Sequence, residues 1–130
     1  MIYFTSDLHF FHDKIIKHTN RPFFSCEEMN QKLINNWNNK VKAIDEVYIL
    51  GDITMKGAKY ATEVLSQLKG IKYLVRGNHD SFLENSIFEK ERFFQWIKDY
   101  HELTYQNTRF ILCHYPILEW NGFYKGTFHL

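Results

Sequence analysis

The sequence predicts an α/β fold, in which the strands of a largely parallel sheet alternate along the chain with helices. Short apolar runs, typical of buried strands, are separated by stretches whose apolar residues recur at helical spacing. Each apolar run ends abruptly in polar residues, and open α/β sheets place their sites at such strand ends. With 130 residues and a hydrophobic content of 45%, we expect a single folded domain over residues 1–130.

The first half of the chain contains two expected strands with helices between them. Residues 2–7 (IYFTSD) form an apolar run that ends in a carboxylate, and residues 13–18 (DKIIKH) suit one or two helical turns. Ser25 and Glu28 form a capping-box pattern and predict the start of a longer helix. One face of that helix is apolar: Met29, Leu33, Ile34, Trp37 and Val41. Residues 46–52 (EVYILGD) are the second expected strand.

The second half repeats this alternation. A further helix has an apolar face, and Gly70 is expected to close it: Ala61, Val64, Leu65 and Leu68. Residues 71–80 (IKYLVRGNHD) read as a third strand that runs into a polar loop. A group of apolar residues suggests a buried helix end: Phe93, Phe94, Trp96 and Ile97. Residues 109–116 (RFILCHYP) are the fourth expected strand.

Composition excludes several classes of protein. The net charge of +1 does not indicate nucleic acid as a partner, although nucleic acid stays open as a substrate and local basic clusters could still bind phosphate. The N-terminus has no basic region and reaches a charge at Asp7, so it does not resemble a signal peptide, and no run approaches the length of a membrane span. Cys26 and Cys113 form no disulfide framework and are expected to be reduced thiols. We therefore expect a cytoplasmic protein with no membrane partner.

The residues that follow the four expected strands share a chemistry. They are Asp7 and His9, then Asp52, then Asn78, His79 and Asp80, and finally His114. Carboxylate, imidazole and amide groups suit borderline divalent metals such as manganese, iron or zinc. Grouping carboxylates without a cation would be unfavourable, and the absence of a cysteine cluster argues against a structural zinc site.

Each motif alone also has a purely structural explanation. Asp7 could cap the following helix, and Gly-Asp after a strand, as at Asp52, is usually a turn. His114 alone would more often be a hydrogen-bonded histidine than a ligand, and Asp80 could either orient His79 or stabilise a turn. The occurrence of all four motifs at successive strand ends favours a common site.

In this order, the motifs DLH at 7–9, GD at 51–52, GNHD at 77–80 and the histidine at 114 resemble those of the calcineurin-like metallophosphoesterase superfamily. The resemblance extends over residues 2–130, and the RPF and NNWNNKV stretches are similar to small bacterial and phage members. It implies a sandwich of two mixed sheets flanked by helices. It also implies hydrolysis of phosphomonoesters or phosphodiesters by a hydroxide that two metal ions activate.

The resemblance further implies roles for individual residues. Asp7 and His9 would bind the first metal, Asp52 would bridge both metals, and Asn78 and His114 would bind the second. Catalysis would depend on Asp52, Asn78 and His79, with His79 contacting the phosphate and assisting the leaving group. We expect manganese, with iron, zinc, nickel or magnesium as alternatives.

Four residues near the motifs are candidate contacts to the phosphate-ester substrate: His12, Arg21, Arg76 and Tyr115. His12 could equally be a solvated loop residue, and Arg76 could instead form a structural ion pair. Tyr115 could stack on a base or line the pocket.

In the superfamily, a Gly-His-x-His motif and closing strands follow the fourth motif, whereas this sequence stops at GTFHL, residues 126–130. We therefore expect a C-terminally incomplete domain with impaired activity and an open sheet edge through which a homodimer could form. His129 lies upstream of the expected motif and is not assigned as a ligand. The alternative is a non-catalytic relative that binds metal or a phosphorylated ligand and pairs with another chain.

Overall fold

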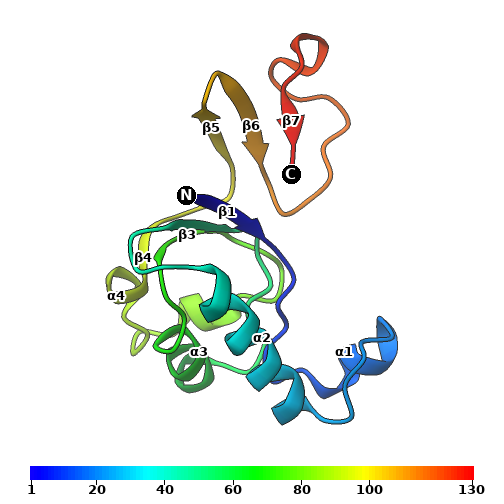
Figure 1. Ribbon diagram of the computed structural model, residues 1–130, viewed down its shortest axis with the longest axis vertical. Helices are drawn as coiled ribbons and strands as arrows, with labels where there is room; N and C mark the ends of the chain where they lie inside the picture. Colours follow the sequence, from blue (N-terminus) through cyan, green and yellow to red (C-terminus); the bar gives the residue numbers. More distant parts are fainter.

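The computed structural model describes residues 1–130 and contains two β-sheets (Figure 1). The first sheet is entirely parallel, with strand order β1-β2-β3-β4. Its strands are β1 (Ile2–Thr5), β2 (Glu46–Ile49), β3 (Ile71–Val75) and β4 (Phe94–Lys98). In the second sheet, β5 and β6 form an antiparallel pair and β7 lies parallel to β6. These strands are β5 (His101–Tyr105), β6 (Thr108–Leu112) and β7 (Phe128–His129).

Helices cover one face of the first sheet, and the second sheet lies against its other face (Figure 1). The α-helices are α1 (Asp13–His18), α2 (Cys26–Lys40), α3 (Ala58–Leu65) and α4 (Lys90–Phe93). Two short 3₁₀ helices complete the fold, η1 (Ser81–Glu84) and η2 (Phe123–Lys125). The expected α/β sandwich is confirmed. None of the helices has the length and apolar character that crossing a membrane would require.

Two apolar cores hold these layers together. The larger core joins α2 and α3 to the first sheet and includes the fully buried Phe10, Ile49 and Leu74. The smaller core lies between the sheets, where Tyr48 and Leu112 are its buried members from β2 and β6. Because the first sheet is covered on both faces, its central strands are mostly apolar, as the sequence indicated; the exceptions are Glu46 in β2 and Lys72 in β3.

The capping pattern at Ser25 marks the start of α2, as predicted. The Ser25 hydroxyl accepts a hydrogen bond from the main-chain N–H of Glu28 at 3.1 Å. In return, the Glu28 carboxylate accepts a bond from the main-chain N–H of Phe24 at 2.8 Å. These contacts occupy donors that a helix N-terminus otherwise leaves without partners.

The buried helix end predicted around residues 93–97 is right at Phe93 and wrong for Phe94, Trp96 and Ile97, which lie in a strand. Helix α4 ends at Phe93, and the next five residues form β4, which pairs in parallel with β3. Phe94 packs in the larger core, whereas Trp96 packs against the smaller one. The pairing of β4 with β3 shifts register between Phe94 and Ile97, which breaks the period of two that identifies a strand and explains the error.

Two further expectations need correction. The strand predicted at residues 109–116 is β6, and it belongs to the second sheet rather than to one parallel sheet with the others. Helix α3 ends at Leu65, so Gly70 does not close it. Gly70 instead has a φ of +92° directly before β3, where an added Cβ would lie 2.7 Å from the side chain of Val41.

Candidate functional site

The loops that follow β1 and β2 are joined by main-chain hydrogen bonds. The N–H of Asp7 donates to the carbonyl of Gly51 at 3.0 Å, and the N–H of His9 donates to the carbonyl of Asp52 at 3.0 Å. Asp7, His9 and Asp52 all have left-handed backbone conformations, with φ values of 54°, 52° and 58°. Such conformations cost non-glycine residues about 1–3 kcal/mol each and persist only where the surrounding structure enforces them.

Two glycines allow the loops after β2 and β3 to approach each other. A Cβ on Gly77 would collide with Oδ1 of Asp52 and would lie 2.7 Å from the Asp52 nitrogen. A Cβ on Gly51, which has a φ of +92°, would lie 2.7 Å from the Cα of Gly77. The glycines of the GD and GNHD motifs are therefore required by close packing of the two backbones.

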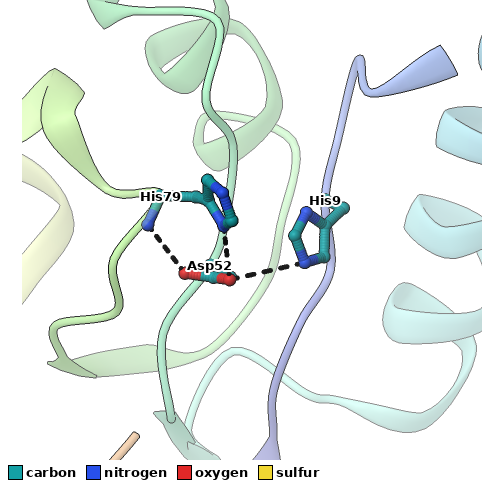
Figure 2. A group of neighbouring side chains, drawn as sticks. All are labelled: His9, Asp52 and His79. Atoms are coloured by element: carbon teal, nitrogen blue, oxygen red, sulfur yellow. Dashed lines mark hydrogen bonds and ion pairs between the residues drawn. The ribbon is translucent and has the colours of Figure 1, made fainter. Parts of the chain in front are cut away.

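Asp52 lies at the centre of the site and is only 3% exposed. Its Oδ1 accepts a hydrogen bond from the main-chain N–H of His79 at 2.9 Å, and its Oδ2 lies 2.8 Å from Nδ1 of the His79 ring. Nε2 of His9 lies 3.4 Å from Oδ2, and Nε2 of His114 lies 3.6 Å from Oδ1. Figure 2 shows His9 and His79 reaching Asp52 from two different loops.

The charge of Asp52 is stabilised by these neighbours. Burial alone would raise the pKa of Asp52, but the hydrogen bonds from the ring and main chain of His79 outweigh this effect and lower the pKa below its ordinary value. Asp52 is therefore an ionised carboxylate whose two oxygens face different imidazoles.

Two groups of side chains in this site could each hold a metal ion. The first is His9, Asp52 and His79, and the second is Asp7, Asp52 and His114. Within each group the ligand atoms lie within 4.8 Å of one another. Asp52 belongs to both groups, and Asp7 also lies near the first, with Oδ1 3.8 Å from Nε2 of His9.

Asn78 and His114 have an arrangement that suits a cation. Nδ1 of His114 donates to the carbonyl of Leu50 at 2.7 Å, which leaves the lone pair on Nε2. This Nε2 lies 2.9 Å from Oδ1 of Asn78. Two acceptors at this distance repel each other unless a cation or a proton lies between them.

His9 is held in the form that binds metals. Its Nδ1 lies 3.1 Å from Nδ1 of His12, and its Nε2 faces Asp52. Burial lowers the pKa of His9 and outweighs the opposing attraction of Asp52, so the neutral imidazole is favoured. Metal-binding histidines commonly use their second ring nitrogen in such an orienting hydrogen bond. His12 thus lies in the site, in contact with His9.

The donor set consists of carboxylate, imidazole and amide groups, which fits borderline divalent metals. No thiolate belongs to either group, although Cys113 is adjacent to His114. The residues present therefore fit a divalent metal pair, while the expectation of manganese remains a prediction.

Three other candidate substrate contacts lie in different surroundings. The guanidinium of Arg76 pairs with Glu84 at 2.7 Å and with Asp99 at 3.2 Å, which supports the ion-pair interpretation. Tyr115 is 55% exposed and meets the His114 ring edge-on, with centroids 5.1 Å apart. The partly buried Arg21 donates to two main-chain carbonyls of the loop after β1.

Asp80 has a role that the sequence left open. It is 2% exposed and accepts three main-chain hydrogen bonds, from Asp52 at 2.9 Å, Ile53 at 2.8 Å and Gly77 at 2.8 Å. It therefore joins the loops after β2 and β3, and the turn-stabilising alternative is the one that the structure supports. Burial raises the pKa of Asp80, and these three hydrogen bonds oppose that rise.

We expect Asp80→Asn to loosen this junction. An amide has one acceptor oxygen, and its NH₂ group would face a main-chain N–H, so at least one buried donor loses its partner. The free energy of unfolding should fall by about 1–3 kcal/mol, and metal affinity should fall by roughly 10-fold. Urea unfolding and metal titration would measure both. Asp99→Asn, a change at an exposed ion pair, is the control, and equal behaviour of the two variants would refute the role of Asp80.

A family model and several known proteins are similar to this chain. A family model described as calcineurin-like phosphoesterase matches residues 1–130. An uncharacterised protein of the archaeon Methanocaldococcus jannaschii is 43% identical over 117 residues, which cover 88% of this chain and 58% of that protein. The Gene 66 protein of Mycobacterium phage L5 is 38% identical over 81 residues, covering 60% of this chain and 39% of that protein.

A solved structure is also similar. The crystal structure of a protein of unknown function from Aquifex aeolicus has a TM-score of 0.70 and 31% sequence identity, covering 89% of this chain and 61% of that one. This chain thus spans about 58% of the length of its archaeal relative and a smaller share of the phage protein. The longer relatives contain parts that have no counterpart in these 130 residues.

Proposed function

Because the chain belongs to the calcineurin-like phosphoesterase family, whose model matches residues 1–130, we propose that it acts in metal-dependent hydrolysis of phosphate esters. The observation that carries this proposal is the sharing of Asp52 by two groups of metal-binding side chains. A buried carboxylate with a different donor set at each oxygen is the arrangement that a two-metal phosphoesterase needs.

We assign the metal-binding residues by combining the family pattern with these distances. Asp7 and His9 would hold the first metal, Asn78 and His114 the second, and Asp52 both. When bound, the two cations would neutralise phosphoryl charge and lower the pKa of a water molecule. The neutral amide of Asn78 limits the negative charge at the second position, where a further carboxylate would repel the substrate.

His79 would act on the leaving group. Its Nδ1 lies 2.8 Å from Oδ2 of Asp52, and this contact orients the ring and leaves Nε2 free to exchange a proton. With a side chain that is 36% exposed, His79 is accessible to a substrate while remaining attached to the central carboxylate. A positioned imidazole of this kind can donate a proton to the departing alkoxide.

The proposal can be tested by hydrolysis of bis(p-nitrophenyl) phosphate and p-nitrophenyl phosphate. The protein would first be treated with a chelator, and then assayed with added manganese, magnesium, zinc, nickel or ferrous iron. We expect no turnover without metal and saturable turnover with at least one of these ions. Metal binding measured by calorimetry without turnover on either substrate would instead support a non-catalytic metal-binding relative.

A further inference from the structure

We propose that Arg21 is a positioning residue, which holds the main chain between Asp7 and His9 so that both side chains reach the metal site. This inference rests on the proposed function, because it assigns Arg21 an effect on metal binding. It replaces the expectation from the sequence that Arg21 contacts the phosphate of the substrate.

The guanidinium of Arg21 is occupied by contacts within the protein. Nη2 donates to the carbonyl of Asp7 at 2.8 Å, and Nη1 donates to the carbonyl of Leu8 at 2.9 Å. Nη1 also lies 3.5 Å from the sulfur of Met29, and Nε donates to the hydroxyl of Thr19 at 3.3 Å. Each of the three guanidinium nitrogens therefore already has a partner on this chain.

Arg21 binds the segment of residues 7–9, which contains two residues in unfavourable backbone conformations. Asp7 and His9 have φ values of 54° and 52°, which are unfavourable for side chains larger than glycine. On one side, their N–H groups are bonded to the loop after β2, through the carbonyls of Gly51 and Asp52. Arg21 supplies the bonds on the other side, to the carbonyls of Asp7 and Leu8. The ligand segment is thus fixed through both its donors and its acceptors.

Only an arginine can make this pair of contacts with one side chain. Its planar group presents parallel N–H donors in a fixed fork, which can bridge two successive carbonyls. A lysine ammonium in the same place is a single point of charge on a flexible stem, and it would not fix the relative orientation of two peptide groups. The residue type therefore matters beyond its charge.

The positioning role and the phosphate-contact role predict different measurements for Arg21→Gln and Arg21→Lys. We expect both variants to lose roughly 10-fold to 100-fold in metal affinity, the range for residues that orient metal ligands. Excess metal should restore most of kcat, while KM and inhibition by inorganic phosphate at saturating metal should stay near their values in the unchanged protein. Arg109→Gln, at an exposed position on β6, is the matched control. Unchanged metal affinity with a KM raised 10-fold or more would overturn the proposal.

A measurement on the unchanged protein covers the case in which the variants do not fold. In the magnesium-loaded protein, the guanidinium ¹⁵N–¹H resonances of Arg21 should not move when inorganic phosphate is added. A saturable shift of these resonances would refute the positioning role. If the unchanged protein bound no metal, the proposed function itself would fail; if it bound metal and the variants bound equally well, only the role of Arg21 would be wrong.

Discussion

We expect Asp52→Asn to lower kcat/KM by at least about 100-fold and to weaken the binding of both metals. Replacing residues that only orient ligands already costs about 10–100-fold, so the loss of a directly binding carboxylate should reach the upper end of that range or exceed it. Asp52 is the residue common to both candidate metal groups, and its two oxygens face different imidazoles. Its replacement is therefore expected to affect both proposed metals at once.

Asparagine is the informative substitution at this position. Asp52 has a φ of 58°, a conformation that asparagine tolerates well, and the amide oxygen can still accept the main-chain N–H of His79. Circular dichroism should show a folded protein, while calorimetric titration with manganese should show weaker binding at both sites. The control is Asp99→Asn, which changes an exposed carboxylate outside the site. Near-normal turnover of Asp52→Asn with manganese would show that the carboxylate is not shared.

The parts of the fold that could be predicted from the sequence depend on local signals. The first three strands and the start of α2 at Ser25 follow from apolar runs and from a capping pattern, both of which lie within a few neighbouring residues. The convergence of Asp7, Asp52 and Asn78 follows from geometry, because parallel strands end at the same edge of a sheet.

Other features depend on contacts between distant residues and could not be predicted. Strand β4 has no clear local signal, because Phe94 and Trp96 lie two residues apart yet pack against different cores, and a register shift in its pairing with β3 interrupts the usual alternation. His114 was expected in the site from the order of the motifs and the family resemblance; it follows β6 of the second sheet, and a hydrogen bond to the Leu50 carbonyl holds it near Asp52. No local pattern in the sequence specifies that contact.

The partners of the charged residues Arg21 and Asp80 could not be predicted from the sequence either. Both are of types that often contact substrates, and in the structure both bind main-chain groups of the loops that carry the candidate metal ligands. A backbone N–H or carbonyl leaves no signature in the sequence, so such a partner cannot be recognised from residue types. The sequence shows only that Asp80 lies next to the candidate site, because it directly follows the GNH residues of its motif.

His79→Ala should separate proton donation from metal binding. We expect turnover of substrates with poor alkoxide leaving groups to fall by roughly 100-fold to 10,000-fold, the range for general acid–base groups. The loss should be much smaller for nitrophenyl esters, because nitrophenolate departs without protonation. His79 lies in the same group as His9 and Asp52, so it could instead be a ligand, and metal affinity distinguishes the two roles.

A second substitution, His79→Gln, makes the comparison sharper. Glutamine can keep a hydrogen bond to Oδ2 of Asp52, which His79 contacts at 2.8 Å, but it cannot supply a proton as an acid. If His79 is the proton donor, both variants should bind metal normally and lose turnover according to the pKa of the leaving group. Equal losses for good and poor leaving groups would indicate a phosphate contact, and a large fall in metal affinity for both variants would indicate a ligand. Either result would contradict the assignment of His79 as the acid, because proton transfer is the one role whose cost depends on the leaving group.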